Sequence, residues 1–222
     1  SQNIKDDVVA IEDERFFQHN GIDAQGLIGA AWNNFTGGRL AGGSTITQQY
    51  VKNAIIEEGR ILGDNEMIQG ATERSISRKL NEARYAIAVE NQMTKEQILT
   101  GYLNLAQFGP SQWGVEAASR YFYGVPASDV TLEQAAMLAG ITQAPGKWNP
   151  ITNQDEAKQR RDTVIRTMAE TGAITRAESV QYIAEPLGVL ERPNSLPRGC
   201  ITAGDRGFFC DYVLQYLDEN GL

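Results

Sequence analysis

The sequence predicts a mainly α-helical protein, and three observations support that fold class. Residues 94–97, 131–134 and 175–178 carry the Thr-x-x-Gln or Thr-x-x-Glu pattern of a capping box, which opens a helix. Apolar residues recur at helical spacing in several segments. Segments with the patterning of strands are few and short.

A helix is expected from about residue 72 to about residue 92. One of its stripes is apolar and is expected to face the core: Ile76, Leu80, Ala83 and Ile87. The opposite stripe carries Arg74, Arg78, Glu82 and Tyr85. Two further helices are expected to start near residues 132 and 155, and Gly172 is expected to end the second.

The chain is predicted to form one compact helical domain over residues 1–185. Three prolines, Pro186, Pro193 and Pro197, then indicate a looser linker over residues 186–222. This linker holds both cysteines, Cys200 and Cys210. They are either two unrelated thiols or a disulfide that closes a short loop. We favour the disulfide, which would imply an extracytoplasmic location.

Charge and length exclude some classes of function. The 222 residues carry a formal net charge of −8, which disfavours general nucleic-acid binding. The sequence contains no run of 18 apolar residues, so no membrane span is predicted. The chain starts and stops abruptly, and we expect it to be part of a longer protein.

The densest polar segment is residues 42–53, where two glycines precede a predicted helix. Its hydroxyls, amides and cation are Ser44, Thr45, Thr47, Gln48, Gln49 and Lys52. Polar groups at a helix start commonly bind an anion. Arg74, Arg78 and Lys79 add a basic stripe that suits a pyrophosphate, and the alternative is a solvated helix face with an Arg78–Glu82 pair.

Glu12 interrupts an apolar run beside Asp13, Phe16 and Phe17. Such a carboxylate is suited to general acid–base chemistry. The alternative is a helix end with exposed acidic side chains, which would show the same sequence pattern. His19 is the sole histidine and is expected to order a turn. A metal site built on histidine and cysteine is therefore not expected.

Five segments together resemble the peptidoglycan glycosyltransferases of family 51, the polymerase domains of class A penicillin-binding proteins. They are residues 12–21, 43–49, 78–82, 95–104 and 120–124, in the order of the family's five motifs. In the fifth, Tyr123 and Val125 stand where the family often has phenylalanine and lysine. No role is therefore carried onto a lysine there.

The resemblance implies a lysozyme-like helical fold and the polymerisation of lipid II into β-1,4-linked glycan strands. It implies Glu12 as the general base and Glu82 as the acid that assists departure of undecaprenyl pyrophosphate. Asp13, Phe16 and His19 would shape the surroundings of Glu12. The residues expected to hold the donor are Ser44, Thr45, Gln48, Gln49, Lys52, Arg74, Arg78 and Lys79. No cofactor is required, and a divalent cation (Mg or Mn) at Glu82 is compatible with the family.

The implied partners are lipid II, the nascent glycan chain and the membrane surface, reached through an anchor of the parent protein. No nucleic acid is implied. Transpeptidase activity is not expected in this chain, which lacks the Ser-x-x-Lys and Lys-Thr-Gly signatures of acyl transfer. A C-terminal transpeptidase domain is expected beyond residue 222, because the Cys-containing tail looks like the start of a linker. Moenomycin, which mimics the phosphorylated donor, is expected to bind. Residues 54–70 are expected to approach lipid.

Two other classes of function share some of these features. A lysozyme-like hydrolase or lytic transglycosylase would use a catalytic glutamate, but it would have little use for Lys52, Arg74 and Arg78 together. A catalytically silent scaffold would be expected to lack Glu12 or Glu82, and both are present.

Overall fold

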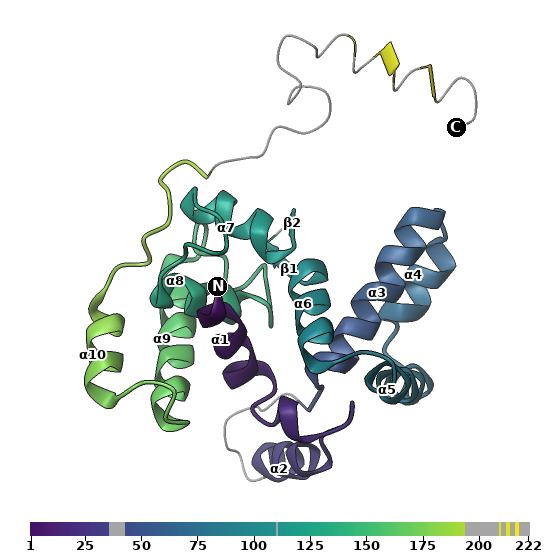
Figure 1. The fold of residues 1–222 in the computed structure, drawn as a ribbon, viewed down its shortest axis with the longest axis horizontal. Coiled ribbons are helices and arrows are strands. Elements are labelled where there is room, and N and C mark those ends of the chain that lie inside the picture. The colour runs from purple at the N-terminus through teal and green to yellow at the C-terminus, as the bar shows by residue number, and fades with distance from the viewer. Residues whose placement is uncertain (36–42, 110, 194–208, 210–211, 214–215, 218–222) are drawn as a thin grey trace.

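The protein was studied as a computed structural model, which describes residues 1–35, 43–109, 111–193, 209, 212–213 and 216–217 (Figure 1). Its elements in chain order are α1 (Gln2–Glu12), the short 3-10 helix η1 (Phe16–Gln18), α2 (Ala24–Phe35), α3 (Ile46–Leu62), α4 (Asn65–Thr72), α5 (Ile76–Glu90), α6 (Lys95–Leu105), β1 (Gln107–Gly109), β2 (Gln112–Trp113), α7 (Val115–Tyr123), α8 (Leu132–Ile141), α9 (Gln154–Glu170) and α10 (Arg176–Ala184). The predicted mainly α fold class is confirmed.

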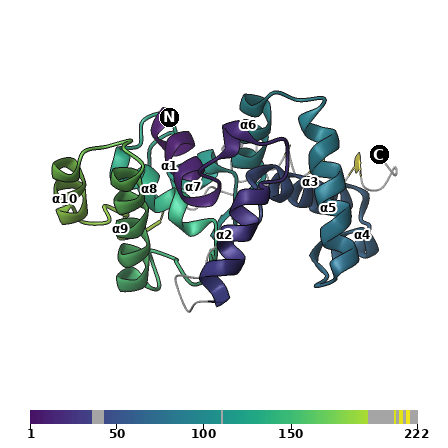
Figure 2. The ribbon, with the colours of Figure 1, turned by 90° about the horizontal axis from the view of Figure 1, so that it is seen from below.

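The helices form two groups that lie side by side (Figures 1 and 2). In the first, α8 packs against α1 and α9, and α10 covers α9. In the second, α3 packs against both α4 and α5. Helix α6 joins the groups because it contacts α3 on one side and α7 on the other. The antiparallel pair β1–β2 follows α6, with Gln107 opposite Trp113.

Local capping signals place the helix starts. The three predicted capping boxes are present, at Thr94, Thr131 and Thr175, each with its reciprocal side-chain and backbone hydrogen bonds. A fourth, Thr45 with Gln48, opens α3. The predicted stop of α9 is also confirmed, since Gly172 follows it with φ +80°.

Helix α8 is the centre of the hydrophobic core. Its residues from Ala135 to Ile141 are all buried, and Val164 and Ile165 of α9 pack into the same cluster. From the α1 side, Ile4 and Val8 complete it. Helix α1 is thereby fixed against α8 and α9, which sets the position of its last residue, Glu12.

The predicted orientation of α5 is wrong. Ile76, Leu80 and Ile87 were expected in the core, yet they are 82%, 66% and 43% exposed. The buried residues of this helix are Glu82 and Ala86. Helical periodicity identifies a stripe but not its partner, and here Glu82 is buried while Glu90 accepts a hydrogen bond from Thr47 of α3.

The C-terminal predictions lie largely outside the described residues. Cys200 and Cys210, with their predicted disulfide, fall there. The division into a domain of residues 1–185 and a linker stays a prediction. In the described part of the chain, no helix combines the length and the apolar character that crossing a membrane would require.

Candidate active site

Glu12 ends α1, and its carboxylate joins the two groups of helices. Its Oε2 accepts a hydrogen bond from Gln49 Nε2 of α3 at 2.9 Å, and its Oε1 accepts one from Thr142 Oγ1 at 3.4 Å. Arg160 Nη2 of α9 lies 3.8 Å from Oε1. The hydroxyl of buried Tyr102 donates to Gln49 Oε1 at 3.4 Å. These contacts hold the carboxylate in one orientation.

Asp13 and His19 fix the chain that leaves α1. Both carboxylate oxygens of Asp13 lie 2.9 Å from His19 Nε2, and Oδ2 also accepts the backbone N–H of Ile46 at 3.0 Å. Burial raises the pKa of the Asp13 carboxyl, and these hydrogen bonds oppose the rise. Phe16 is fully buried beneath this pair, with Lys95 Nζ 4.4 Å from its ring centroid. His19 orders the turn, as expected.

Gly21 closes the same turn against two helices. Its φ is +86°, and a Cβ there would lie 2.8 Å from the backbone carbon of Ala86 in α5. Its carbonyl accepts a hydrogen bond from Thr45 Oγ1 at 2.8 Å. Glycine is needed here both for the backbone conformation and for the close approach. The turn after Glu12 is thus attached to α3 and α5.

The polar side chains at the start of α3 have two different roles: some stabilise the helix, and one contacts Glu12. Thr45 and Gln48 are buried and satisfy each other's backbone N–H groups in the capping box. Thr47 donates to Glu90 of α5. Gln49, one residue after Gln48, contacts Glu12 instead. Of the two amides predicted to bind the donor, Gln49 therefore lies at the site and Gln48 serves as a cap.

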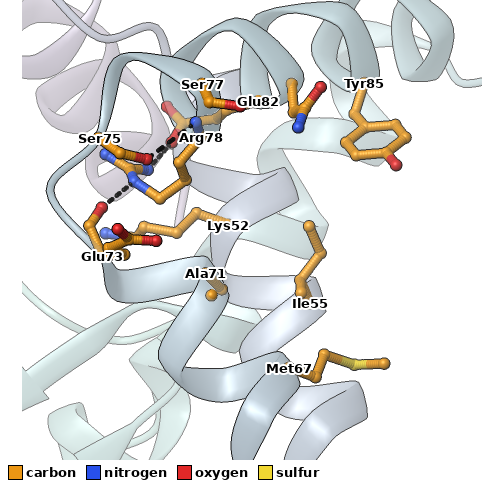
Figure 3. Close-up of a pocket in the computed structure, with 12 residues that line it drawn as sticks. Lys52, Ile55, Met67, Ala71, Glu73, Ser75, Ser77, Arg78, Glu82 and Tyr85 are labelled. Carbon is orange, nitrogen blue, oxygen red and sulfur yellow. Dashed lines mark hydrogen bonds and ion pairs between the residues drawn. The ribbon is translucent and has the colours of Figure 1, made fainter.

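A cationic cluster faces α3 from α5. Buried Glu82 pairs with Arg78 through one oxygen and with Lys79 through the other. Lys79 Nζ also donates to Ser44 Oγ at 2.8 Å. A cavity of about 520 Å³ lies between the helices, and Lys52 of α3 reaches into it toward Arg78 (Figure 3). Glu73 also lines this cavity, so the three cations Lys52, Arg78 and Lys79 stand against two carboxylates, Glu73 and Glu82. The guanidinium of Arg78 and the ammonium of Lys52 are groups that bind phosphate oxygens.

Charged groups of α5 and of α1 both act on Lys52. Burial lowers the pKa of its ammonium, while the carboxylates of Glu82 and Glu12 act to raise it. Arg74 is exposed and does not line this cavity. The structure therefore brings together Lys52, Arg78 and Lys79 of the predicted cations, and leaves Arg74 apart.

A divalent cation at Glu82 would have few protein ligands. Both carboxylate oxygens are paired with cations, and the described residues contain no group of three or more His, Cys, Asp or Glu side chains placed to hold a metal. The residues present do not form a protein-built metal site, so no step is assigned to a metal.

Two further cavities adjoin these residues. One of about 310 Å³ is lined by Glu12, Asp13, Ser44 and Thr45. It meets the cationic cluster at Ser44, the partner of Lys79. The other, of about 400 Å³, lies between α3 and the β1–β2 pair and shares Lys52 with the cationic cavity.

Tyr102, Thr142 and Arg160 also contact Glu12 or its partner Gln49, and none of them was predicted as a site residue. Tyr102 lies within the fourth motif, and burial raises the pKa of its hydroxyl, with the charge of Glu12 adding to the rise. Thr142 and Gln143 are a polar pair directly after the apolar helix α8, a change in character that could have indicated them. Arg160 carried no comparable signal.

A fixed carboxylate near a cluster of cations is an arrangement suited to group transfer from an anionic donor. Comparison with known proteins agrees: a family model described as Transglycosylase matches residues 1–169. The chain belongs to this transglycosylase family. The resemblance to the peptidoglycan glycosyltransferases of family 51 is confirmed, and so is the lysozyme-like helical fold class.

Relatives of the chain are penicillin-binding proteins. It is 37% identical to penicillin-binding protein 2D of Bacillus subtilis over 180 residues, which are 81% of this chain and 24% of the relative. It is 38% identical to penicillin-binding protein 2a of Streptococcus pneumoniae over 181 residues, 82% of this chain and 22% of that relative. A crystal structure of penicillin-binding protein 1A from Haemophilus influenzae matches 72% of this chain and 19% of its own, with 20% identity and a TM-score of 0.39. The chain thus spans about a quarter of the length of the curated relatives it matches.

Proposed function

We propose that this chain is a peptidoglycan glycosyltransferase that polymerises lipid II into β-1,4-linked glycan strands and releases undecaprenyl pyrophosphate. One observation carries the proposal: the cavity lined by Glu12 meets the cationic cluster at Ser44, which accepts a hydrogen bond from Lys79 at 2.8 Å. A base and a site for an anionic leaving group are therefore adjacent, as displacement at a sugar carbon requires.

The reaction is a single displacement with inversion. Glu12 takes the proton from the 4-hydroxyl of the incoming lipid II. That oxygen then bonds to the anomeric carbon of the growing chain, while the bond from this carbon to the pyrophosphate oxygen breaks. The electron pair leaves with the pyrophosphate, and Arg78, Lys79 and Lys52 neutralise its charge. An α-linked donor gives a β-linked product.

Each neighbour of Glu12 supports its role as base. Gln49 donates to Oε2, and Tyr102 in turn donates to Gln49. Thr142 contacts Oε1. We assign these residues to positioning, because Gln49 and Thr142 contact the carboxylate and Tyr102 donates to Gln49.

A lysozyme-like hydrolase is the competing function. It would also use a glutamate at a helix end, but its substrate carries no pyrophosphate. Lys52 and Arg78 both line the cavity beside Glu82, and a glycan without phosphate would have little use for two cations there.

We further propose that the second helix group contacts the outer surface of the cytoplasmic membrane. Exposed apolar side chains lie on α3 and α5: Ile61, Leu62, Ile76 and Leu80. Such side chains suit the boundary between water and lipid. The parent protein would supply the anchor and a transpeptidase domain. If chains with Ile61→Ser and Leu62→Ser bind liposomes as well as the unaltered chain does, this placement is wrong.

The decisive experiment follows polymer formation from labelled lipid II. Glu12→Gln preserves shape and removes the base, so we expect the rate to fall by about 10²-fold to 10⁴-fold. Glu82→Gln should also lower the rate. Glu156→Gln, an exposed acid in the first turn of α9, is the matched control and should polymerise normally. Undiminished polymer from Glu12→Gln would remove the assignment of the base.

Two further measurements separate the alternatives. Soluble sugar fragments released from finished peptidoglycan would favour the hydrolase. Moenomycin should bind the unaltered chain, and Arg78→Ala should weaken that binding. Equal binding by the variant would count against the cationic cluster as the phosphate site.

A further inference from the structure

Arg160 of α9 connects the proposed base to the end of α8. Its Nη2 lies 3.8 Å from Glu12 Oε1, and its Nε donates to the backbone carbonyl of Gly140 at 3.1 Å. Gly140 lies in the last turn of α8, where carbonyl groups have no partner within the helix. A guanidinium is planar and holds its donors in a fixed geometry. The hydrogen bond to α8 therefore also fixes the nitrogen that faces Glu12.

A glycine makes room for this side chain. A Cβ at position 140 would lie 3.0 Å from Arg160 Cγ and 3.5 Å from Val164 Cγ2. Glycine inside a helix usually destabilises it relative to alanine. Gly140 is buried in the helix at the centre of the core, and the close approach of Arg160 explains why a glycine stands there. The placement of Arg160 thus depends on how α8 and α9 pack.

The pair of Arg160 and Glu12 is shielded from water. Each of the two side chains is 11% exposed. Burial disfavours the charged form of a carboxylate, whereas an opposite charge close by favours it. Salt and water screen a buried pair less than an exposed one. Arg160 therefore favours the ionised form of Glu12, the form that a general base needs in order to accept a proton.

Other titratable groups lie around Glu12. Lys52 of α3 and Tyr102 of α6 both interact with its charge. Burial raises the pKa of the Tyr102 hydroxyl, so this group stays neutral. The cavity that Glu12 lines also holds the charged or titratable side chains of Asp13, Glu14, Arg15 and Asp23. Of these, Arg15 pairs with Asp23 at 2.6 Å, and Asp13 pairs with His19. Lys52 and Arg160 are therefore cations on two different sides of the base.

These two cations differ in their relation to the cavities. Lys52 lines the cationic cavity, so an anionic ligand bound there offsets part of its charge. Arg160 lines none of the three cavities that Glu12 or Lys52 lines. Its charge therefore acts on Glu12 whether or not a ligand is bound.

We propose that Arg160 is a positioning residue that keeps Glu12 ionised while the cationic cavity holds its anionic ligand. The assignment rests on the proposed glycosyltransferase function, in which Glu12 is the base. A pyrophosphate bound at Lys52 and Arg78 adds negative charge near Glu12, which favours its protonation before the acceptor hydroxyl arrives. Arg160 opposes that early protonation, and it acts through Glu12 rather than on the substrate.

The pH dependence of lipid II polymerisation tests the charge of Arg160. The profile of kcat is measured, because it reports groups in the substrate-bound enzyme. In Arg160→Gln, which is uncharged, the acid-side midpoint of the profile should rise by about 1 pH unit. Arg160→Lys keeps the charge and should return the midpoint most of the way to that of the unaltered chain. Exposed Arg166 on the same helix is the control, and Arg166→Gln should leave the profile unchanged.

A second measurement does not require activity. The Glu12 carboxyl is titrated by ¹³C NMR, and its signal is assigned by its loss in Glu12→Gln. Arg160→Gln should raise the midpoint of this titration by about 1 pH unit too. Gly140→Ala should move it in the same direction by less, because the new Cβ displaces Arg160. Thermal unfolding shows whether each variant is folded, and Gly140→Ala keeps the proposal testable if Arg160→Gln misfolds.

The outcomes separate the role of Arg160 from the function on which it rests. If the unaltered chain polymerises lipid II but neither midpoint moves in Arg160→Gln, the role is wrong and the function stands. The role is also wrong if Arg160→Lys moves the midpoint as far as Arg160→Gln does, or if only the NMR midpoint moves. If the NMR midpoint moves but the unaltered chain does not polymerise lipid II, the glycosyltransferase function fails instead. Moenomycin binding weakened about tenfold or more in Arg160→Gln would make Arg160 a ligand contact and overturn the proposal.

Discussion

Gln49 Nε2 of α3 donates to Glu12 Oε2 of α1 at 2.9 Å, a direct side-chain contact between the two groups of helices. The two residues are 37 positions apart in the chain. Helix α1 is fixed by the core around α8, and α3 is fixed by its contacts with α4, α5 and α6. The orientation of the proposed base thus depends on how the two groups pack together.

Adjacent amides with different roles give the first prediction. Gln49→Ala should lower the polymerisation rate about tenfold to a hundredfold, because Glu12 loses the donor that orients it. Its thermal stability should fall less than that of Gln48→Ala, because the hydrogen bond that buried Tyr102 donates to Gln49 is long, at 3.4 Å. Gln48→Ala should instead destabilise the chain by about 1–3 kcal/mol, because the buried N–H of Thr45 loses its acceptor. Equal effects of both changes on rate and on stability would contradict this division.

The pH dependence of stability gives the second prediction. Asp7 is fully buried, and neither carboxylate oxygen has a hydrogen-bond partner. Burial, with a smaller contribution from Asp6, raises its pKa well above the usual range. Its contribution to stability is therefore complete below the unfolded pKa of about 3.9 and is lost as the pH rises through the folded pKa.

Asp7→Asn should thus flatten the fall in the free energy of unfolding as the pH rises from 4 upward, measured by chemical denaturation. The exposed neighbour Asp6 supplies the control, because Asp6→Asn should leave the slope almost unchanged. A steeper slope in Asp7→Asn, or no change, would show that Asp7 does not titrate in this way.

Two glycines with positive φ give the third prediction. Gly21→Ala should cost more than Gly63→Ala in unfolding free energy. Both take on the strain of a left-handed backbone, about 1–2 kcal/mol. At Gly21 the new Cβ would also lie 2.8 Å from the backbone of Ala86, whereas at Gly63 no atom lies within 4 Å. Gly21→Ala should slow polymerisation too, since it displaces the turn beside Glu12. Equal stabilities of the two variants would contradict the close approach seen at Gly21.

Arg161 gives the fourth prediction. Its fully buried guanidinium pairs with Asp162 and donates to the carbonyls of Ile183, Glu185 and Pro186. Arg161→Leu should cost about 3 kcal/mol and raise the hydrogen-exchange rates of α10 amides. Exposed Arg166 on the same helix is the control, and Arg166→Leu should change stability by less than about 0.5 kcal/mol. Unchanged exchange in α10 would show that Arg161 does not secure this end of the domain.

The sequence could predict what local chemistry dictates. The capping boxes at Thr94, Thr131 and Thr175 depend on hydrogen bonds between residues three positions apart, so their spacing is visible in the chain itself. The five ordered motifs indicated the family for the same reason, because residue type and order are properties of the sequence. Glu12, Lys52, Arg78 and Glu82 were predicted as site residues in this way.

Only the tertiary structure decided which partners these residues have. The apolar stripe of α5 predicted burial, yet the buried residues are Glu82 and Ala86, and Glu90 accepts a hydrogen bond from Thr47 of α3. Gln48 and Gln49 are alike in sequence, and the packing of α3 made one a cap and the other a contact of Glu12. Thr142 reaches Glu12 across 130 positions of the chain. Such contacts depend on how whole helices pack, and no local spacing encodes that.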